Sequence, residues 1–108
     1  MTAPAILTPR ARQELAKALE RIAEDNPDSA AGLYETVQEA ARLIGANPAI
    51  GARRPRLASA RYRFWSILRY HYLLAYADAP EPPRIVRIVH MKRDLPRVLA
   101  ELRDLPEH

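Results

Sequence analysis

The chain has 108 residues, no cysteine and a formal net charge of +4. This length predicts one domain, residues 1–108, that can bury a core without disulfides, and the lack of cysteine excludes thiolate chemistry and suits a reducing compartment. With no signal peptide evident and no run near the roughly 18 apolar residues of a membrane span, a soluble cytoplasmic protein is expected.

The charge is unevenly distributed along the chain. Residues 1–52 hold 5 Lys/Arg and 7 Asp/Glu, a net of −2, whereas residues 53–108 hold 12 Lys/Arg and 6 Asp/Glu, a net of +6. Eleven of those 12 cations are arginine, which binds carboxylates and phosphates bidentately. An acidic protein or a nucleic acid would satisfy such a surface, and a solvated basic face with no partner is the alternative.

The first half predicts a short strand and two helices. Residues 5–7 form an apolar edge strand, and Thr8 with Pro9 begins an amphipathic helix over 9–24. Asn26 is expected to cap a second helix over 27–44. Gly45 is expected to end that helix in the left-handed conformation, with Pro48 preventing its continuation.

The middle of the chain predicts a loop and two strands. Residues 45–60 are punctuated by glycine and proline and predict a loop that exposes Arg53, Arg54 and Arg56. Residues 61–77 are dense in aromatic and branched side chains, but they are too long for one ordinary strand. We divide them near residues 66–69, although that stretch lacks glycine, proline, asparagine and aspartate.

The last part predicts a central strand and a short helix. Three prolines in residues 78–83 cannot donate to a ladder and predict a hairpin loop. The stretch RIVRIVHMKRD, residues 84–94, begins as a strand covered on both faces and ends in a charged cluster. Asp94 is expected to cap the final helix, and Pro106 to end the ordered part. The apolar stripe of that helix consists of Leu95, Val98, Leu99 and Leu102.

These elements predict an α+β domain in the order strand, helix, helix, three strands, helix. Helices joined by so short a link lie antiparallel, and strands joined by hairpins are antiparallel as well. The predicted architecture is an N-terminal helical hairpin packed on one face of a small antiparallel sheet.

Four stretches carry a resemblance to a known family. They are LTPRARQELAKALERIAEDNPDSA, ANPAIGARRP, RYHYLLAYAD and RIVRIVHMKRDLPRVL. Together they cover nearly the whole chain and, in this order, resemble toxins of the RelE/ParE superfamily from bacterial type II toxin–antitoxin pairs. The last stretch is most similar to the ParE branch.

The resemblance implies a growth-inhibiting toxin neutralised by a cognate antitoxin whose amphipathic segment wraps around it, in a hetero-oligomer. ParE-like members inhibit DNA gyrase, and we take this as the expected function. RelE-like members cut messenger RNA on the ribosome, which is the alternative, but the position where they carry an arginine is apolar here, around Leu73. The C-terminal helix also lacks the tyrosine that the nuclease branch often places there.

Candidate site residues follow from the resemblance and the charge pattern. No catalytic residue is predicted for a gyrase inhibitor; a nuclease would use His90, Lys92 and Arg93 as acid, base and charge stabilisers. The antitoxin is expected to contact Tyr72, Leu95, Val98, Leu99 and Leu102. The target is expected to contact Arg53, Arg54, Arg56, Arg87, Lys92 and Arg93.

Each candidate also has a structural interpretation. His90 suits a strand-end histidine bound to backbone, and the stripe of the last helix can simply close the core. Lys92 and Arg93 suit a solvated turn. No acid or histidine lies at ligand spacing to His71 or His108, so no metal is predicted, and no cofactor is expected.

Overall fold

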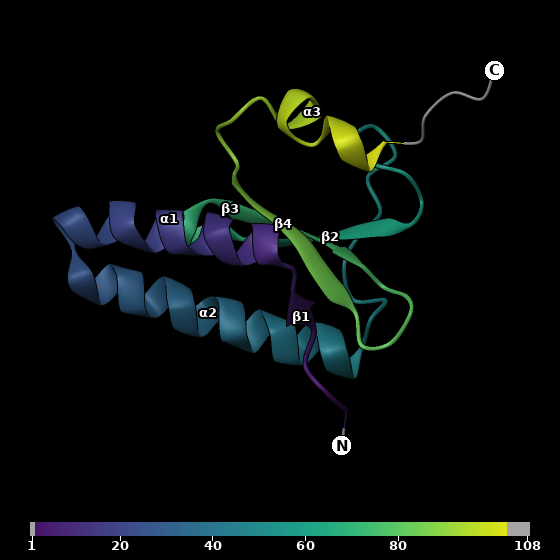
Figure 1. The fold of residues 1–108 in the computed structure, drawn as a ribbon, viewed down its shortest axis with the longest axis horizontal. Coiled ribbons are helices and arrows are strands. Elements are labelled where there is room, and N and C mark those ends of the chain that lie inside the picture. The colour runs from purple at the N-terminus through teal and green to yellow at the C-terminus, as the bar shows by residue number, and fades with distance from the viewer. Residues whose placement is uncertain (1, 104–108) are drawn as a thin grey trace.

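The computed structural model describes residues 2–103, so Pro106 and His108 lie outside the described part. Two long helices form one layer, a sheet forms the next, and a short C-terminal helix covers the other side of the sheet (Figure 1). The elements are β1 Ile6–Leu7, α1 Pro9–Asp25, α2 Pro27–Ala46, β2 Tyr62–Ile67, β3 Tyr72–Ala77, β4 Arg84–His90 and α3 Leu95–Val98. The predicted α+β architecture is confirmed.

The helical hairpin begins each helix where the sequence predicts. The Thr8 hydroxyl accepts a hydrogen bond from the Ala11 N–H at 3.2 Å, and Pro9 opens α1. The Asn26 side chain accepts from the N–H groups of Asp28 and Ser29 at 3.1 and 3.2 Å. Both caps satisfy amide groups that a helix start leaves without partners.

The expected left-handed end of α2 at Gly45 is wrong. The helix continues through Gly45 to Ala46 and ends at Asn47, whose N–H binds the Leu43 carbonyl. None of the glycines in residues 2–103 has a positive φ. Gly45 is buried, and a side chain there would overlap the Ala3 carbonyl oxygen. The glycine is therefore needed for close packing of the N-terminal segment on the helix.

The sheet has the strand order β1-β4-β3-β2. The three long strands are antiparallel as predicted, whereas the two residues of β1 pair with β4 in parallel, which the sequence analysis did not predict. The break between β2 and β3 lies at a 3-10 turn, Leu68–Tyr70, followed by His71 at φ 61°. Histidine is among the residues that adopt this left-handed conformation more often than most, so the turn forms without glycine or asparagine.

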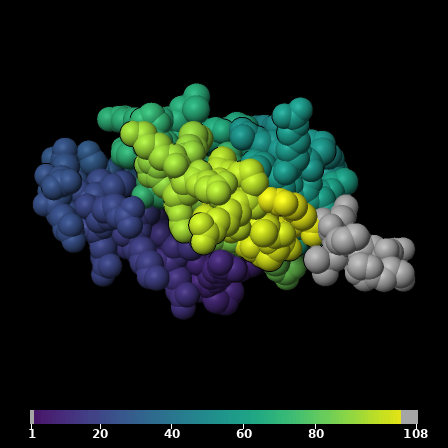
Figure 2. All heavy atoms as spheres, turned by 90° about the horizontal axis from the view of Figure 1, so that it is seen from above, coloured from purple at the N-terminus to yellow at the C-terminus, as the bar shows by residue number. Residues whose placement is uncertain are grey.

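Two apolar cores lie on opposite faces of the sheet. The first packs α1 and α2 against side chains such as Tyr72, Leu74 and Ile88. The second packs the sheet against the C-terminal segment, which lies across the middle of the face seen in Figure 2. β4 lies between β1 and β3 with most of its side chains buried, so the predicted central strand covered on both faces is confirmed.

The C-terminal helix is shorter than predicted from the apolar stripe that runs from Leu95 to Leu102. α3 spans four residues, and a 3-10 turn, Ala100–Leu102, follows it. Asp94 occupies the N-cap position, but its side chain makes no capping hydrogen bond, so the predicted side-chain cap is wrong. Within residues 2–103, every helix is too short or too polar to cross a membrane.

Candidate functional site

The loop with the three predicted arginines is exposed, and hydrogen bonds to a buried side chain fix its position. Arg53, Arg54 and Arg56 are all exposed, and Arg53 lies 3.3 Å from the Asp78 carboxylate. The loop is fixed by Tyr76, a fully buried side chain of β3. Its hydroxyl donates to the Pro48 carbonyl at 2.7 Å and accepts from the Gly51 N–H at 2.8 Å. Burial raises the pKa of the Tyr76 hydroxyl above its usual value, so it stays a donor at neutral pH.

Replacing Tyr76 by phenylalanine is expected to loosen this loop. The change leaves the Gly51 N–H and the Pro48 carbonyl without their partner, at a cost of about 1–2 kcal/mol in unfolding free energy. Limited trypsin digestion should then cut faster after Arg53 and Arg56, since the Arg54–Pro55 bond resists trypsin. Tyr62→Phe, on half-buried β2, is the matched control, and equal cleavage rates in the two variants would contradict the role of the Tyr76 hydroxyl.

The expectation that Arg87 faces a target is wrong. Its side chain is 4% exposed, and its guanidinium is fully engaged. It binds both carboxylate oxygens of Glu14 at 2.9 to 3.1 Å, the Val98 carbonyl at 2.7 Å and the Glu101 carboxylate. Arg87 thus ties α1, β4 and the C-terminal segment together.

The C-terminal stripe divides into buried and half-buried residues. Leu99 and Leu102 are 0% and 5% exposed and close the second core, so they are not available to an antitoxin in this conformation. The reason is that the segment folds back onto Leu73 and Val89 instead of leaving a groove. Leu95 and Val98 are half-buried at the margin of this core and remain candidates for antitoxin contact.

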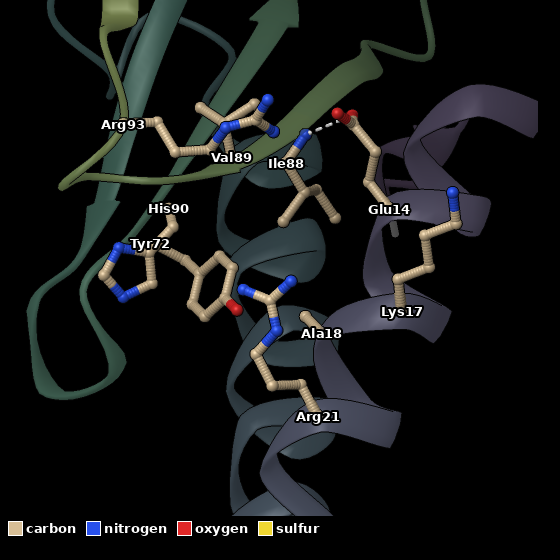
Figure 3. Close-up of a pocket in the computed structure, with 9 residues that line it drawn as sticks. All are labelled: Glu14, Lys17, Ala18, Arg21, Tyr72, Ile88, Val89, His90 and Arg93. Atoms are coloured by element: carbon tan, nitrogen blue, oxygen red, sulfur yellow. Dashed lines mark hydrogen bonds between the residues drawn. The ribbon is translucent and has the colours of Figure 1, made fainter.

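A cleft of about 470 Å³ lies between α1 and the end of β4. Lys17 and Arg21 reach it from α1, and Arg93 reaches it from the loop after β4 (Figure 3). Tyr72, which is only 6% exposed and belongs to the first core, and His90 line it as well, their ring centroids 5.0 Å apart in an edge-on arrangement. Lys92 lines an adjoining hollow next to Arg21, Arg93 and Asp25. The structure therefore gathers four of the predicted site residues, Tyr72, His90, Lys92 and Arg93, around one cation-rich surface.

His90 is bound to backbone at the strand end, as its structural interpretation proposed. Its Nδ1 accepts a hydrogen bond from the Lys92 N–H at 3.1 Å, so the neutral ring carries its proton on Nε2. Burial is the main cause that lowers the pKa of His90, and the nearby charges of Lys92, His71 and Arg21 add to it. His90 is therefore a neutral hydrogen-bond donor at neutral pH.

This lowered pKa predicts a loss of stability in mild acid. In the unfolded chain the His90 ring binds a proton with the ordinary pKa of 6.5, whereas in the folded chain the same ring binds it less well. Protonation of His90 therefore favours unfolding once the pH falls below about 6.5. Unfolding free energies measured between pH 7.5 and 5 should fall more steeply in the parent protein than in His90→Gln. A difference between the two proteins that stays constant with pH would contradict this prediction.

The α1 residues of the cleft were missed by the sequence analysis. Glu14, Lys17 and Arg21 have helical spacing of three and four, which places them along one face of α1. That spacing was visible, but nothing local showed that this face lies beside the end of β4. Among residues 2–103, histidines and acids form no group of three or more able to hold a metal ion.

A small α+β domain with a helical hairpin, an antiparallel sheet and a basic surface is the architecture of a RelE/ParE-like toxin. A family model described as the ParE toxin of the type II toxin–antitoxin system, parDE, matches residues 5–95. The chain belongs to this family and is the toxin of a type II pair, which implies an antitoxin partner. A search of curated proteins found no match.

Proposed function

We propose that this toxin inhibits DNA gyrase by protein binding in the bacterial cytoplasm and is neutralised by its cognate antitoxin. The family match over residues 5–95 is the observation that carries the proposal. The loop with Arg53, Arg54 and Arg56 supports it, because exposed arginines suit the carboxylates of a protein surface. Lys92 and Arg93 extend the basic surface near the cleft.

The second core supports binding in preference to catalysis. The position where the nuclease branch carries an arginine is apolar here, around Leu73, and Leu73 itself is 1% exposed beneath the C-terminal segment. Leu99 covers the same core. This face of the sheet is therefore filled by apolar packing, whereas the basic loop is exposed to a large partner.

A gyrase supercoiling assay with purified toxin tests the proposal. The parent toxin should block supercoiling. The double variant Arg54→Ala/Arg56→Ala should need about tenfold more protein for the same effect, because each substitution removes the charge-assisted hydrogen bonds of one arginine. The control Arg12→Ala/Arg42→Ala removes two exposed arginines from the helices instead. Supercoiling unaffected by the parent toxin would refute gyrase inhibition.

One observation favours RNA cleavage as a second candidate. His90 and Tyr72 are in edge contact at a cleft that Lys17, Arg21 and Arg93 also line. Cleavage without a metal needs proton-transfer groups and cations placed around one phosphate, and these residue types meet that need.

A translation-coupled messenger RNA cleavage assay, run beside the supercoiling assay, separates the two candidates. Under the gyrase proposal, transcripts stay intact and His90→Ala still blocks supercoiling. Under the nuclease alternative, transcripts are cut, supercoiling continues, and His90→Ala lowers the cleavage rate by about 100-fold or more.

A further inference from the structure

The outer edge of β4 already binds a carboxylate that the chain supplies itself. β1 covers only the start of β4, where Ile6 and Leu7 pair with Arg84 and Ile85. Further along, the Ile88 N–H points away from β3 and donates to the Glu14 carboxylate at 2.9 Å (Figure 3). The guanidinium of Arg87 holds the same carboxylate. One backbone amide and one arginine thus form a carboxylate site between α1 and β4.

The same arrangement recurs two residues further along the strand. Amide directions alternate along an antiparallel ladder, so the His90 N–H points to the same side as that of Ile88. On α1, Lys17 and Arg21 follow Glu14 at three and seven residues, on the same face of the helix. This second position therefore combines a backbone amide with cations. Glu14 on the cleft wall and Asp25 in the adjoining hollow are the acids nearby, and neither forms an ion pair with those cations.

The cations of this second position have no acidic partner in the described chain. Within residues 2–103, Lys17, Arg21, Lys92 and Arg93 form none of the ion pairs, whereas Arg87 and Arg63 are both paired. A cluster of donors around an open hollow of about 470 Å³ has room for a carboxylate side chain from outside.

We infer that this cleft is a binding site for an acidic side chain, aspartate or glutamate, from an extended segment of the antitoxin. The inference rests on the proposed neutralisation of the toxin by its antitoxin and names the chemistry of one contact. Glu14 favours a carboxylate as the occupant, because it shows that this edge of β4 binds one through an amide and an arginine. A nucleic acid phosphate is the competing occupant, and the experiment includes it.

The first test uses a hexaglutamate peptide and a six-nucleotide uridine RNA as probes of the full-length toxin. In amide NMR spectra, the peptide should shift the His90 signal and raise the pKa of the His90 ring, because a nearby anion favours the protonated ring. Both changes should disappear in Arg21→Ala/Arg93→Ala. They should persist in Arg12→Ala/Arg42→Ala, which loses the same charge at exposed helix positions.

The second test uses the cognate antitoxin of this toxin. Its affinity should fall about tenfold or more for Arg21→Ala/Arg93→Ala and should stay unchanged for the control variant. Both exposed arginines can be removed without opening the core. Unfolding free energies of the variants show directly whether the fold is kept.

The outcomes separate the inference from the proposed function. An antitoxin that binds the parent and the cleft variant equally well overturns the inference and leaves neutralisation intact. An antitoxin that does not bind the parent refutes neutralisation, and the inference fails with it even if the peptide occupies the cleft. If RNA shifts the His90 amide signal at a lower concentration than the peptide does, the preferred occupant of the cleft is a phosphate and not a carboxylate. This result also overturns the inference.

Discussion

Replacing Arg87 by alanine is expected to cost about 3 kcal/mol or more of unfolding free energy. The change leaves the carboxylate of Glu14 between α1 and β4 without its cation and the Val98 carbonyl without a donor. Charges in such places are costly when one partner is removed, because the Glu14 side chain is only 18% exposed and regains little contact with water. Chemical denaturation of the purified protein measures the effect.

Arg84 provides the matched control for this experiment. It lies on the same strand and carries the same charge, but it is exposed, so Arg84→Ala should change the unfolding free energy by only about 0.5 kcal/mol. In the double variant Arg87→Ala/Glu14→Gln the carboxylate is neutral, and part of the loss should be recovered. A loss below about 1 kcal/mol for Arg87→Ala alone would show that the network contributes little.

Replacing Gly45 by alanine is expected to cost about 2 kcal/mol, although alanine is the better helix former. A β-carbon at this position would overlap the Ala3 carbonyl oxygen and lie 2.7 Å from the α-carbon of Pro4. Both atoms belong to the backbone, so the N-terminal segment has to move. Hydrogen exchange at the Ala5 and Ile6 amides should quicken, because they bind Ala41 and Pro83 in the packed arrangement.

Gly32→Ala is the control on the same helix. There a β-carbon would meet the hydroxyl end of Tyr70, a side chain that can rotate aside. Alanine should therefore be neutral or stabilise the protein by up to about 1 kcal/mol. A Gly45→Ala variant as stable as Gly32→Ala would show that the N-terminal segment does not pack tightly against α2.

The parts of the fold set by local chemistry could be predicted from the sequence. Thr8 with Pro9 and Asn26 with Pro27 marked both helix starts, because a capping side chain and a proline act on the residues next to them. The strands could also be predicted, because their composition is a property of the strand residues themselves. The end of α2 was misplaced because Gly45 responds to Ala3 and Pro4, which lie 41 or more residues away along the chain.

The candidate site was predicted only in part, since its partners lie far apart in sequence. Arg87 was interpreted as a surface cation, and its partner Glu14 is 73 positions earlier. His90 and Arg93 were singled out from one charged stretch, whereas Lys17 and Arg21 join them only because α1 packs beside β4. A single sequence does not show such pairings. The gyrase target and the antitoxin contacts stay predictions.

Glu14 also affects whether a strand of another chain can pair with the outer edge of β4. A strand from another molecule would need free backbone amides on β4 to pair with it. At Ile88 it would instead meet the negative charge of Glu14, which Arg87 holds in place. At the far side, Phe64 is bridged to Ala52, and Ser66 follows beyond that bridge. Pairing of another strand is therefore disfavoured where Glu14 occupies the Ile88 amide of β4, and the Phe64 bridge covers one position on the opposite edge of the sheet.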